Sequence, residues 1–449
     1  MLPCSAFAQV STGSFHSFFL CPNGTVFEWG LNGTGQLGDG TFADKHVPMQ
    51  LWSISDIKMI NGGWGHTISL KNDSTVWCWG QNAYGQLGDS TNFSTNTPVN
   101  TVAINSVVSI SAGGLHSLAL KSDSTVWAWG YNFYGELGDN TTADKNFPVN
   151  VFSLNNITMI SAGENHSLAL KSDSTVWAWG ENFYGAVGDG TNTDAIAPEQ
   201  VILIGEIISI AGGGHHSLAL KSDGTVWAWG NNSFGQLGDS TIINRNYPVK
   251  VKGLNNIIAI DGGEFYSLAI MNDSTVWAWG HNFNGELGDS TNIERHTPVQ
   301  IKGLTGVLGI SGGEFHVLAL KSDSTVWSWG RNHVGQLGDS SLLSRNYPSL
   351  VNGIDCSIPL DLDEKEKENK TFVYPNPFRE TAVLRIDSGK RIANCELNIC
   401  NVFGQEMYPQ IIRNQDGFVI CRGDLLHGIY FWKITDEYSI IDAGKIIIE

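Results

Sequence analysis

The chain has 449 residues, too many for one ordinary hydrophobic core, and a formal net charge of −18. It carries no run of Lys or Arg, so we expect binding neither to nucleic acid nor to an anionic membrane surface. No stretch approaches the roughly eighteen apolar residues of a membrane span, and we expect none.

Residues 1–8 are interpreted as the remnant of a secretory signal peptide. Ala6-Phe7-Ala8 before Gln9 has the small-x-small pattern of a signal cleavage site. The alternative is an ordinary short N-terminal segment, because the charged and apolar parts of a signal do not precede this motif.

The seven cysteines show neither a CxxC pair nor the spacing of a metal site. Cys78 is expected to be a small core residue. Cys395, Cys400 and Cys421 lie close together in the sequence, and one disulfide among them is possible if the protein is exported.

Residues 9–354 repeat a unit of fifty residues. The segment KSDSTVWAWG occupies both 121–130 and 171–180, and variants of it recur on the same grid without insertion or deletion. A proline recurs on that grid from Pro48 to Pro348, so that seven prolines accompany the seven Trp-Gly pairs. A fixed period of this size is typical of a repeat architecture.

Each unit is predicted to contain four short strands. In residues 101–150 the strand-like runs are Val107–Ile110, His116–Leu120, Thr125–Trp129 and Pro148–Phe152, and none has helical spacing. Ser122-Asp123-Ser124 is predicted to form a tight hairpin between the second and third runs.

The third run has two apolar faces. Trp127 and Trp129 alternate with Val126 and Ala128, so bulky side chains lie on one face and small ones on the other. Both faces must be covered, and the Trp face of one copy can pack on the Val/Ala face of the next. Four-stranded sheets stacked around an axis form a β-propeller, so we predict an all-β, seven-bladed propeller. Gly113-Gly114 is expected where the strands crowd.

The two ends of the repeat region suggest how the ring closes. Val10-Ser11-Thr12-Gly13 indicates that the chain begins inside a unit, and residues 347–354 (YPSLVNGI) have no unit after them. We predict that 347–354 pairs with the sheet that contains Val10, which would remove exposed sheet edges.

The segment ISAGGLHSLALKSDSTVWAWGYNFYGELGDN resembles the regulator of chromosome condensation repeat, and the resemblance covers about 350 residues. Kelch repeats share the period and a double glycine, but not the spacing of Trp-x-Trp-Gly and Leu-Gly-Asp. The resemblance implies a seven-bladed propeller and indicates little about function, because functional sites are built separately on a shared fold.

Residues that recur in every unit are interpreted as structural. The ring of histidines is expected to bond the following serine within its own blade, since seven positions related by rotation cannot share one metal ion. Its members are His16, His66, His116, His166, His216 and His316, with Tyr266 at the remaining one of the seven positions. Asn32 and Asp39 and their equivalents up to Asn332 and Asp339 are expected to be turn residues. Neither a calcium site nor a Gly-x-Ser-x-Gly nucleophile is indicated, so we expect no metal, no cofactor and no enzyme activity.

Candidate binding residues are sought where the units differ, just after Trp-Gly, because loops on a rigid scaffold carry binding. They are Tyr131, Phe133, Tyr134, Glu181, Phe183, Tyr184, His281, Arg331, His333 and, from another loop, Trp64. The first position after Trp-Gly is predicted to be exposed. For Phe133, Phe183 and Phe283, packing between blades is an equal alternative. The segments equivalent to 41–47 are further candidates.

The composition changes after Ile354. Residues 355–371 are interpreted as a charged linker, and 372–449 as a small Ig-like β-sandwich of short alternating strands. The last segment resembles the C-terminal sorting domain of the type nine secretion system of Bacteroidetes-type bacteria, with an unrelated Ig-like module as the alternative. The residues that match are Tyr374, Pro375, Asn376, Pro377, Gly404, Gly428, Tyr430 and Lys445.

This resemblance implies export across the outer membrane of a Gram-negative bacterium, and removal of the domain on release or surface attachment. We therefore expect a secreted or surface-attached, non-enzymatic, monomeric propeller that uses the type nine machinery and binds an extracellular protein or glycan. The alternatives are a protein inhibitor of a secreted enzyme and guanine-nucleotide exchange. Export removes the GTPase partner that exchange would require.

Overall fold

The computed structural model describes residues 8–356, 370–374, 376, 378–387, 396–401, 406–414, 417–423, 425–426, 428–435 and 440–448. The chain divides into two compact units. The larger comprises Ala8–Leu20 and Thr25–Ile354, and the other includes Cys21–Gly24 and Asp355–Glu449. Within the described ranges no helix has the length and hydrophobicity needed to cross a membrane.

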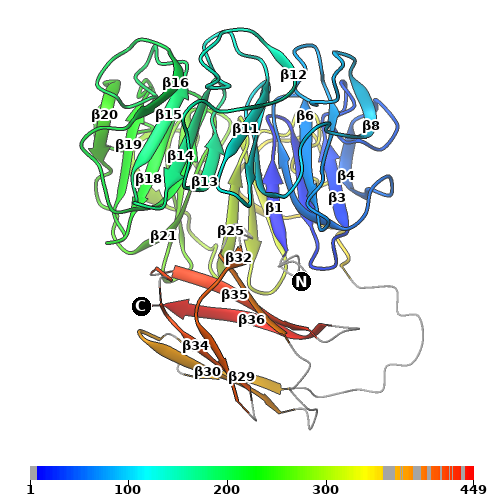
Figure 1. The fold of residues 1–449 in the computed structure, drawn as a ribbon, viewed down its shortest axis with the longest axis vertical. Helices are drawn as coiled ribbons and strands as arrows, with labels where there is room; N and C mark the ends of the chain where they lie inside the picture. Colours follow the sequence, from blue (N-terminus) through cyan, green and yellow to red (C-terminus); the bar gives the residue numbers. More distant parts are fainter. Residues whose placement is uncertain are drawn as a thin grey trace. The chain divides into compact units, whose positions relative to one another are not determined.

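Within residues 9–350 the structure has seven four-stranded antiparallel sheets, each formed by four consecutive strands (Figure 1). The first strands are β1 (Gln9–Thr12), β5 (Ile57–Gly62), β9 (Val107–Ala112), β13 (Ile157–Ala162), β17 (Ile207–Gly212), β21 (Ile257–Gly262) and β25 (Val307–Gly312). The second strands are β2 (His16–Leu20), β6 (His66–Lys71), β10 (His116–Lys121), β14 (His166–Lys171), β18 (His216–Lys221), β22 (Tyr266–Met271) and β26 (His316–Lys321).

The third strands are β3 (Val26–Gly30), β7 (Val76–Gly80), β11 (Val126–Gly130), β15 (Val176–Gly180), β19 (Val226–Gly230), β23 (Val276–Gly280) and β27 (Val326–Gly330). The fourth strands are β4 (Lys45–Gln50), β8 (Thr95–Asn100), β12 (Lys145–Asn150), β16 (Ala195–Gln200), β20 (Arg245–Lys250), β24 (Arg295–Gln300) and β28 (Arg345–Leu350). The predicted all-β, seven-bladed propeller is confirmed.

The predicted hairpin joins the second and third strands of the blade β9–β12. Leu120 pairs with Val126, and Ser124 has a φ of 64°. Asp123 stabilises the turn by accepting hydrogen bonds from the amide and hydroxyl of Thr125, at 3.1 and 2.6 Å. The fourth strand begins at Lys145, three residues before the predicted start at Pro148, because an edge strand tolerates proline.

The blades stack as their two-faced third strands predict. Trp129 is fully buried and shares a hydrophobic cluster with Val76 and Cys78 of the preceding blade. Its indole Nε1 donates to the carbonyl oxygen of Gln86 at 2.9 Å. The ring also covers Gly88, where an added Cβ would lie 2.8 Å from Nε1, so only glycine leaves room for the indole.

The histidine ring joins neighbouring blades, which corrects the predicted bond within a blade. His116 Nε2 lies 2.9 Å from the hydroxyl of Ser167, and His66 Nε2 lies 3.1 Å from that of Ser117. In the sixth unit the Tyr266 hydroxyl makes 3.0 and 2.7 Å bonds to backbone carbonyls of the next blade. Burial lowers the pKa of His116 to about 3, so these rings are neutral.

Ring closure differs from the predicted strand exchange. Strand β28 pairs with β27 of its own blade, with Ser349 opposite Ser328. The prediction was wrong because the first blade already has its own fourth strand, β4, and leaves no vacancy. The contact between the seventh and first blades instead has the same hydrogen bonds as the contacts between other neighbouring blades. Ser17 Oγ and Trp29 Nε1 each donate to the carbonyl of Gln336 at 2.8 Å.

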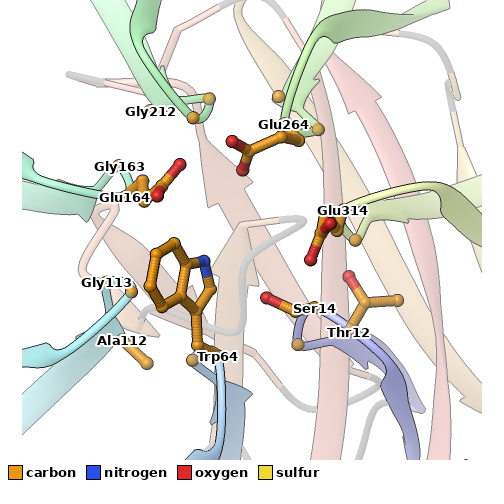
Figure 2. A pocket seen from close by; sticks show the side chains of 18 of the residues that line it. Thr12, Ser14, Trp64, Ala112, Gly113, Gly163, Glu164, Gly212, Glu264 and Glu314 are labelled. Atoms are coloured by element: carbon orange, nitrogen blue, oxygen red, sulfur yellow. The ribbon is translucent and has the colours of Figure 1, made fainter.

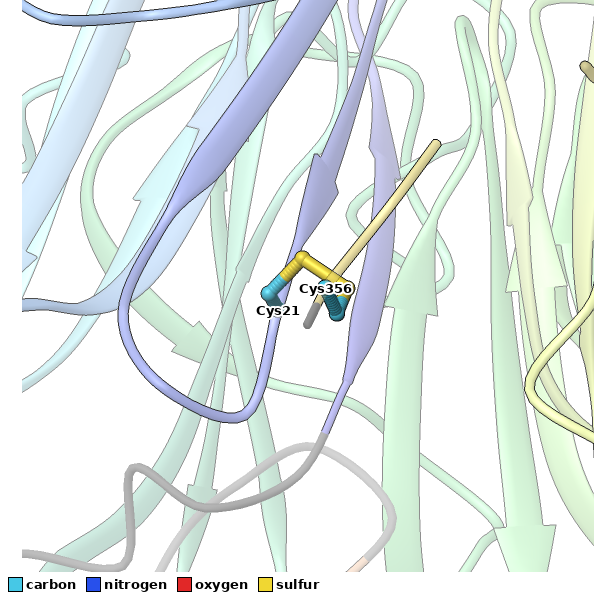
Figure 3. The surroundings of a disulfide bond; sticks show 2 residues. All are labelled: Cys21 and Cys356. Carbon is cyan, nitrogen blue, oxygen red and sulfur yellow. A yellow bond between two sulfur atoms is a disulfide. The ribbon is translucent and has the colours of Figure 1, made fainter. Parts of the chain in front are cut away.

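A disulfide joins Cys21, which directly follows β2, to Cys356, which lies beyond β28 (Figure 3). It links residues 335 positions apart. The sequence suggested a disulfide among the three later cysteines. Neither Cys400 nor Cys421 is disulfide-bonded to another described residue, and Cys395 lies outside the described residues.

The C-terminal unit has two four-stranded sheets, ordered β29-β30-β34-β33 and β32-β31-β35-β36 among the described residues. Their bounds are β29 (Lys370–Tyr374), β30 (Thr381–Asp387), β31 (Glu396–Asn401), β32 (Glu406–Met407), β33 (Ile411–Arg413), β34 (Gly417–Cys421), β35 (Gly428–Thr435) and β36 (Ile440–Ile448). Buried Leu384 and Ile420 of one sheet pack with Ile399 and Trp432 of the other, so the predicted small β-sandwich is confirmed.

Candidate functional site

The propeller exposes two faces that differ in their loops. Because successive strands are antiparallel, the turns after the first strands and the loops after the third strands open on the same face. We call it the loop face; it contains residues 13–15 and 31–44 and their equivalents every fifty residues. All ten binding residues predicted from the sequence lie in these loops.

The turns after the first strands surround a pocket at the mouth of the central channel (Figure 2). One residue from each turn differs between blades and sets the character of this mouth. These residues are Ser14, Trp64, Gly114, Glu164, Gly214, Glu264 and Glu314. The predicted candidate Trp64 therefore lies at the channel mouth, with 39% of its surface exposed.

Acidic side chains gather on one side of the mouth. His215 lies between two of them: its Nδ1 is 3.1 Å from Glu181 Oε2, and its Nε2 is 3.5 Å from Glu164 Oε2. Asn165 also donates to Glu181 Oε2, at 3.1 Å. Donor atoms of Glu164, His215 and Glu264 all lie within 4.8 Å of one another.

This clustering changes how the groups ionise. Burial, reinforced by the nearby Glu164, raises the pKa of Glu264 well above its ordinary value. Burial and Glu164 also raise the pKa of Glu314 to about 7, against the attraction of Arg331. Burial alone would lower the pKa of His215, but hydrogen bonding and charge from Glu181 and Glu164 outweigh it and raise that pKa.

Aromatic rings surround the acidic mouth in two contacting groups. Tyr131 contacts Tyr84 at 4.9 Å between ring centroids and Phe133 at 6.4 Å. The second group spans several blades and ends where Arg331 lies 5.5 Å from the rings of Phe15 and Phe315. Its ring members are Phe183, Tyr184, His215, Phe234, Phe265, His281, Phe283, Phe315, Phe15 and His333.

Exposure separates the predicted binding residues of these loops into three classes. Phe133 and Phe183 are 64% and 68% exposed, and His333 is also exposed, so these side chains do not pack between blades. The predicted exposure of the first position after Trp-Gly is wrong for His281, which is buried beside Glu286 at 3.1 Å. The remaining predicted residues of these loops are half-buried: Tyr131, Tyr134, Glu181, Tyr184 and Arg331.

Exposed apolar residues also recur later in the loops between third and fourth strands. They occupy the positions equivalent to 42 and 43 of the first unit. These positions lie within the segments equivalent to 41–47, where the sequence indicated candidates without distinguishing single residues. They are Phe42, Phe93, Ile242, Ile243, Ile293, Leu342 and Leu343, each at least half exposed. These apolar residues interrupt loops that are otherwise rich in Thr, Asn, Ser and Asp, and this interruption is the sequence signal that could have identified them.

The residues of the predicted sorting motif hold the end of the chain against the start of the sandwich. Asn376 Nδ2 donates to the carbonyl of Lys445 at 3.1 Å, and Asn376 Oδ1 accepts from the amide of Ile447 at 2.7 Å. Tyr430 is buried, and Gly428 begins β35. Tyr374 ends β29, while Pro375, Pro377 and Gly404 lie outside the described residues.

Solved structures with the same architecture are propellers of one family. Human WBSCR16 is 25% identical, with a TM-score of 0.67 over 74% of this chain and 94% of that chain. Prp20p of Saccharomyces cerevisiae is 23% identical, with a TM-score of 0.68 over 74% of this chain and 86% of that chain; this likeness shows the fold alone.

Curated relatives match over single repeats. The human "Probable E3 ubiquitin-protein ligase HERC4" is 43% identical over 54 residues, which are 12% of this chain and 5% of the ligase. The Arabidopsis thaliana "RCC1 domain-containing protein RUG3, mitochondrial" is 35% identical over 52 residues, 12% of each chain. The chain therefore spans only a small part of these relatives.

Family models cover both units of the chain. The secretion system C-terminal sorting domain matches residues 372–449, which indicates export. The regulator of chromosome condensation (RCC1) repeat matches 7–36, 23–70 and 57–86. The RCC1-like domain matches residues 94–358, more than half of the sequence. The chain belongs to the RCC1-like propeller family and ends in a secretion sorting domain.

Proposed function

We propose that this protein is an exported, non-enzymatic binding propeller that holds a protein ligand on its loop face. The sorting domain supports export. The disulfide between Cys21 and Cys356 supports an oxidising destination, because such bonds persist mainly outside the cytosol. We place the protein in the surroundings or on the outer surface of a Gram-negative bacterium, carried there by the type nine machinery as a monomer.

Exposed apolar side chains lie in the loop-face loops of every blade, whereas fewer, such as Trp52, Phe152 and Leu203, lie on the opposite face, and this difference carries the proposal. Phe93 is 80% exposed, and Phe183 and Leu343 are each 68% exposed, on loops of different blades. Exposed apolar groups that gather on one face and are surrounded by polar residues mark interaction sites on soluble domains. Aromatic residues among them are common hot spots of protein interfaces.

The chemistry of these loops favours a protein ligand over a glycan. Ile242, Ile293 and Leu342 are aliphatic and offer no flat ring on which a sugar could stack. Side chains of this kind instead fill the apolar centre of protein–protein interfaces. Half-buried polar groups such as Arg331 and Glu181 contact Phe315 and His215 of the turns around the channel mouth and are suited to fix the orientation of the ligand.

Photo-crosslinking tests the proposal. The full chain is prepared with a photoreactive residue at Phe183, or at Leu203 as a control, and incubated with proteins of the producing culture. Leu203 is 77% exposed and lies in the linker between β16 and β17, on the opposite face. A specific adduct from position 183 that is absent from position 203 supports the loop face. Equal adducts from both positions, or none from 183, contradict it.

A further inference from the structure

We propose that Glu164, His215 and Glu264 form a binding site for one divalent transition-metal ion of the Zn²⁺ type at the mouth of the central channel. The three residues come from consecutive blades: Glu164 follows β13, His215 follows β17 and Glu264 follows β21. Their donor atoms already lie within 4.8 Å of one another. Zn²⁺ ligands lie about 2 Å from the ion, so modest side-chain rotations would bring the three donors into range.

The backbone fixes the three turns relative to one another. The amide of Glu164 donates to the carbonyls of Gly213 and Gly214, at 3.3 and 3.2 Å. The amide of Gly214 donates in turn to the carbonyl of Glu264 at 3.2 Å. A site whose supporting loops are already bonded to one another loses little conformational freedom when it takes up an ion.

The surroundings of His215 orient it as a metal ligand. Its Nδ1 lies 3.1 Å from Glu181 Oε2, and that carboxylate is held by the amide of Asn165. In the neutral ring, Nδ1–H donates to Glu181, and the lone pair of Nε2 then faces Glu164. A carboxylate that fixes the outer nitrogen of a ligating histidine is a usual feature of zinc sites.

One carboxylate oxygen of Glu164, Oε2, lies buried at the site. The side chain is only 8% exposed, and Oε2 accepts no hydrogen bond from the described residues. The nearest imidazole nitrogen, Nε2 of His215, is 3.5 Å from Glu164 Oε2, which is too long for a good hydrogen bond. A buried carboxylate oxygen in this position is costly unless a cation or a proton neutralises it. The carboxylates of Glu164 and Glu264 point toward one another on the same side of the mouth (Figure 2).

The donor set selects the class of ion. One imidazole nitrogen and two carboxylates suit Zn²⁺ and similar ions, whereas Mg²⁺ and Ca²⁺ prefer oxygen ligands alone. Glu314 points to the same opening. The equivalent residues Gly114 and Gly214 carry no donor side chain, so the ligands lie on one side of the ring. The ring of buried histidines takes no part.

Metal uptake by the full chain tests this site. Protein stripped with a chelator is titrated with Zn²⁺ against a competing chromophoric chelator, and separately with Co²⁺ for its visible absorption. We expect one tight equivalent in the wild type and at least tenfold weaker binding in Glu164→Gln and in His215→Gln. The control is His296→Gln, because His296 lies 3.1 Å from Glu294 in a His–Glu pair outside the site. This variant should bind Zn²⁺ as tightly as the wild type does.

Several outcomes would overturn the site. These are no tight equivalent in the wild type, undiminished binding in the ligand variants, or equal weakening in His296→Gln. If Glu164→Gln fails to fold without metal, Glu264→Gln replaces it. A zinc-dependent rise in melting temperature must also be present in the wild type and absent in His215→Gln. A proton shared by Glu164 and Glu264 in place of a metal would appear as no uptake at neutral pH, which contradicts the proposal.

Discussion

The hydroxyl of Ser167 lies 2.9 Å from His116 Nε2 and 2.9 Å from the carbonyl oxygen of Glu136, both in the preceding blade. A hydroxyl has one proton, and a carbonyl can only accept, so Ser167 donates to Glu136 and accepts from Nε2–H of His116. The same geometry fixes the tautomer of the imidazole. Trp179 Nε1 donates to the same carbonyl at 2.7 Å. Each blade is therefore bonded to the next at the loop-face ends of its second and third strands.

Replacing Ser167 should destabilise the propeller without changing its surface. Ser167→Ala leaves the buried Nε2–H of His116 without an acceptor, and an unsatisfied buried polar group costs about 1–3 kcal/mol. Chemical denaturation should show a loss of this size. The matched control is Ser172→Ala in the exposed hairpin, which should change the stability by less than about 0.5 kcal/mol. Equal stabilities for both variants would mean that the bond between blades contributes nothing.

Glu136 should make the propeller less stable as the pH rises. Burial raises the pKa of its carboxyl to about 8, while the unfolded chain ionises it near 4.5. The folded state therefore holds a proton that the unfolded state has lost, and the stability falls as the pH increases from about 4.5 to 8.

Glu136→Gln removes this dependence. Gln86 occupies the equivalent position and accepts from the amide of Tyr84 just as Glu136 accepts from that of Tyr134. The variant should match the wild type at pH 4.5 and be about 2–4 kcal/mol more stable at pH 8. Denaturation curves at the two pH values measure the difference. The same difference between variant and wild type at both pH values would show that folding does not raise the pKa of Glu136.

The Cys21–Cys356 disulfide should stabilise the ring as a whole. It closes a loop of more than three hundred residues, and removal of a native disulfide typically costs about 2–5 kcal/mol. Paired Cys21→Ser and Cys356→Ser should lower the denaturation midpoint by a corresponding amount, and reduction of the wild type should do the same. Cys421→Ser, which breaks no disulfide, is the control. Identical midpoints before and after reduction would contradict this role.

Removal of the sorting domain should leave the disulfide intact. We predict that the mature protein ends between residues 357 and 371, after Cys356 and before the sorting domain at 372–449. Intact-mass measurement of protein from the medium or the cell surface determines the new C-terminus. Full-length chain at both places would argue against processing. A chain that ends before Cys356 would lack one half of the disulfide and would contradict the prediction.

The fold could be predicted from the sequence because its repeat is so regular. Trp129 and Val126 alone define two apolar faces that only a neighbouring copy can cover, and the structure confirms that packing. The closure could not be deduced in the same way. Strand β1 at Val10 has only four residues, so the sequence indicates a start inside a unit. The sequence pattern also does not show that β28 pairs with β27 of its own blade. The partner of Cys21 lies 335 residues away, so no local pattern indicates it.

The site was harder to foresee than the fold. The sequence indicated which loops differ but not which side chains point outward, so His281 was expected at the surface although it is buried against Glu286. Glu164, His215 and Glu264 occupy two different positions of the repeat, and only the curvature of the ring brings them together. Recurring residues attract notice in a repeat protein, whereas a site formed by residues that do not recur leaves no periodic signal.

The most direct test of the binding face measures affinity and stability on the same variants. The ligand captured through position 183 is titrated against the wild type, Phe183→Ser and Leu203→Ser, and each protein is also melted. Loss of an aromatic hot spot costs about 2 kcal/mol or more, so Phe183→Ser should bind roughly thirtyfold more weakly. Leu203→Ser should bind normally, and all three melts should agree. Undiminished binding by Phe183→Ser, with weakened binding by Leu203→Ser, would contradict the assignment of the loop face.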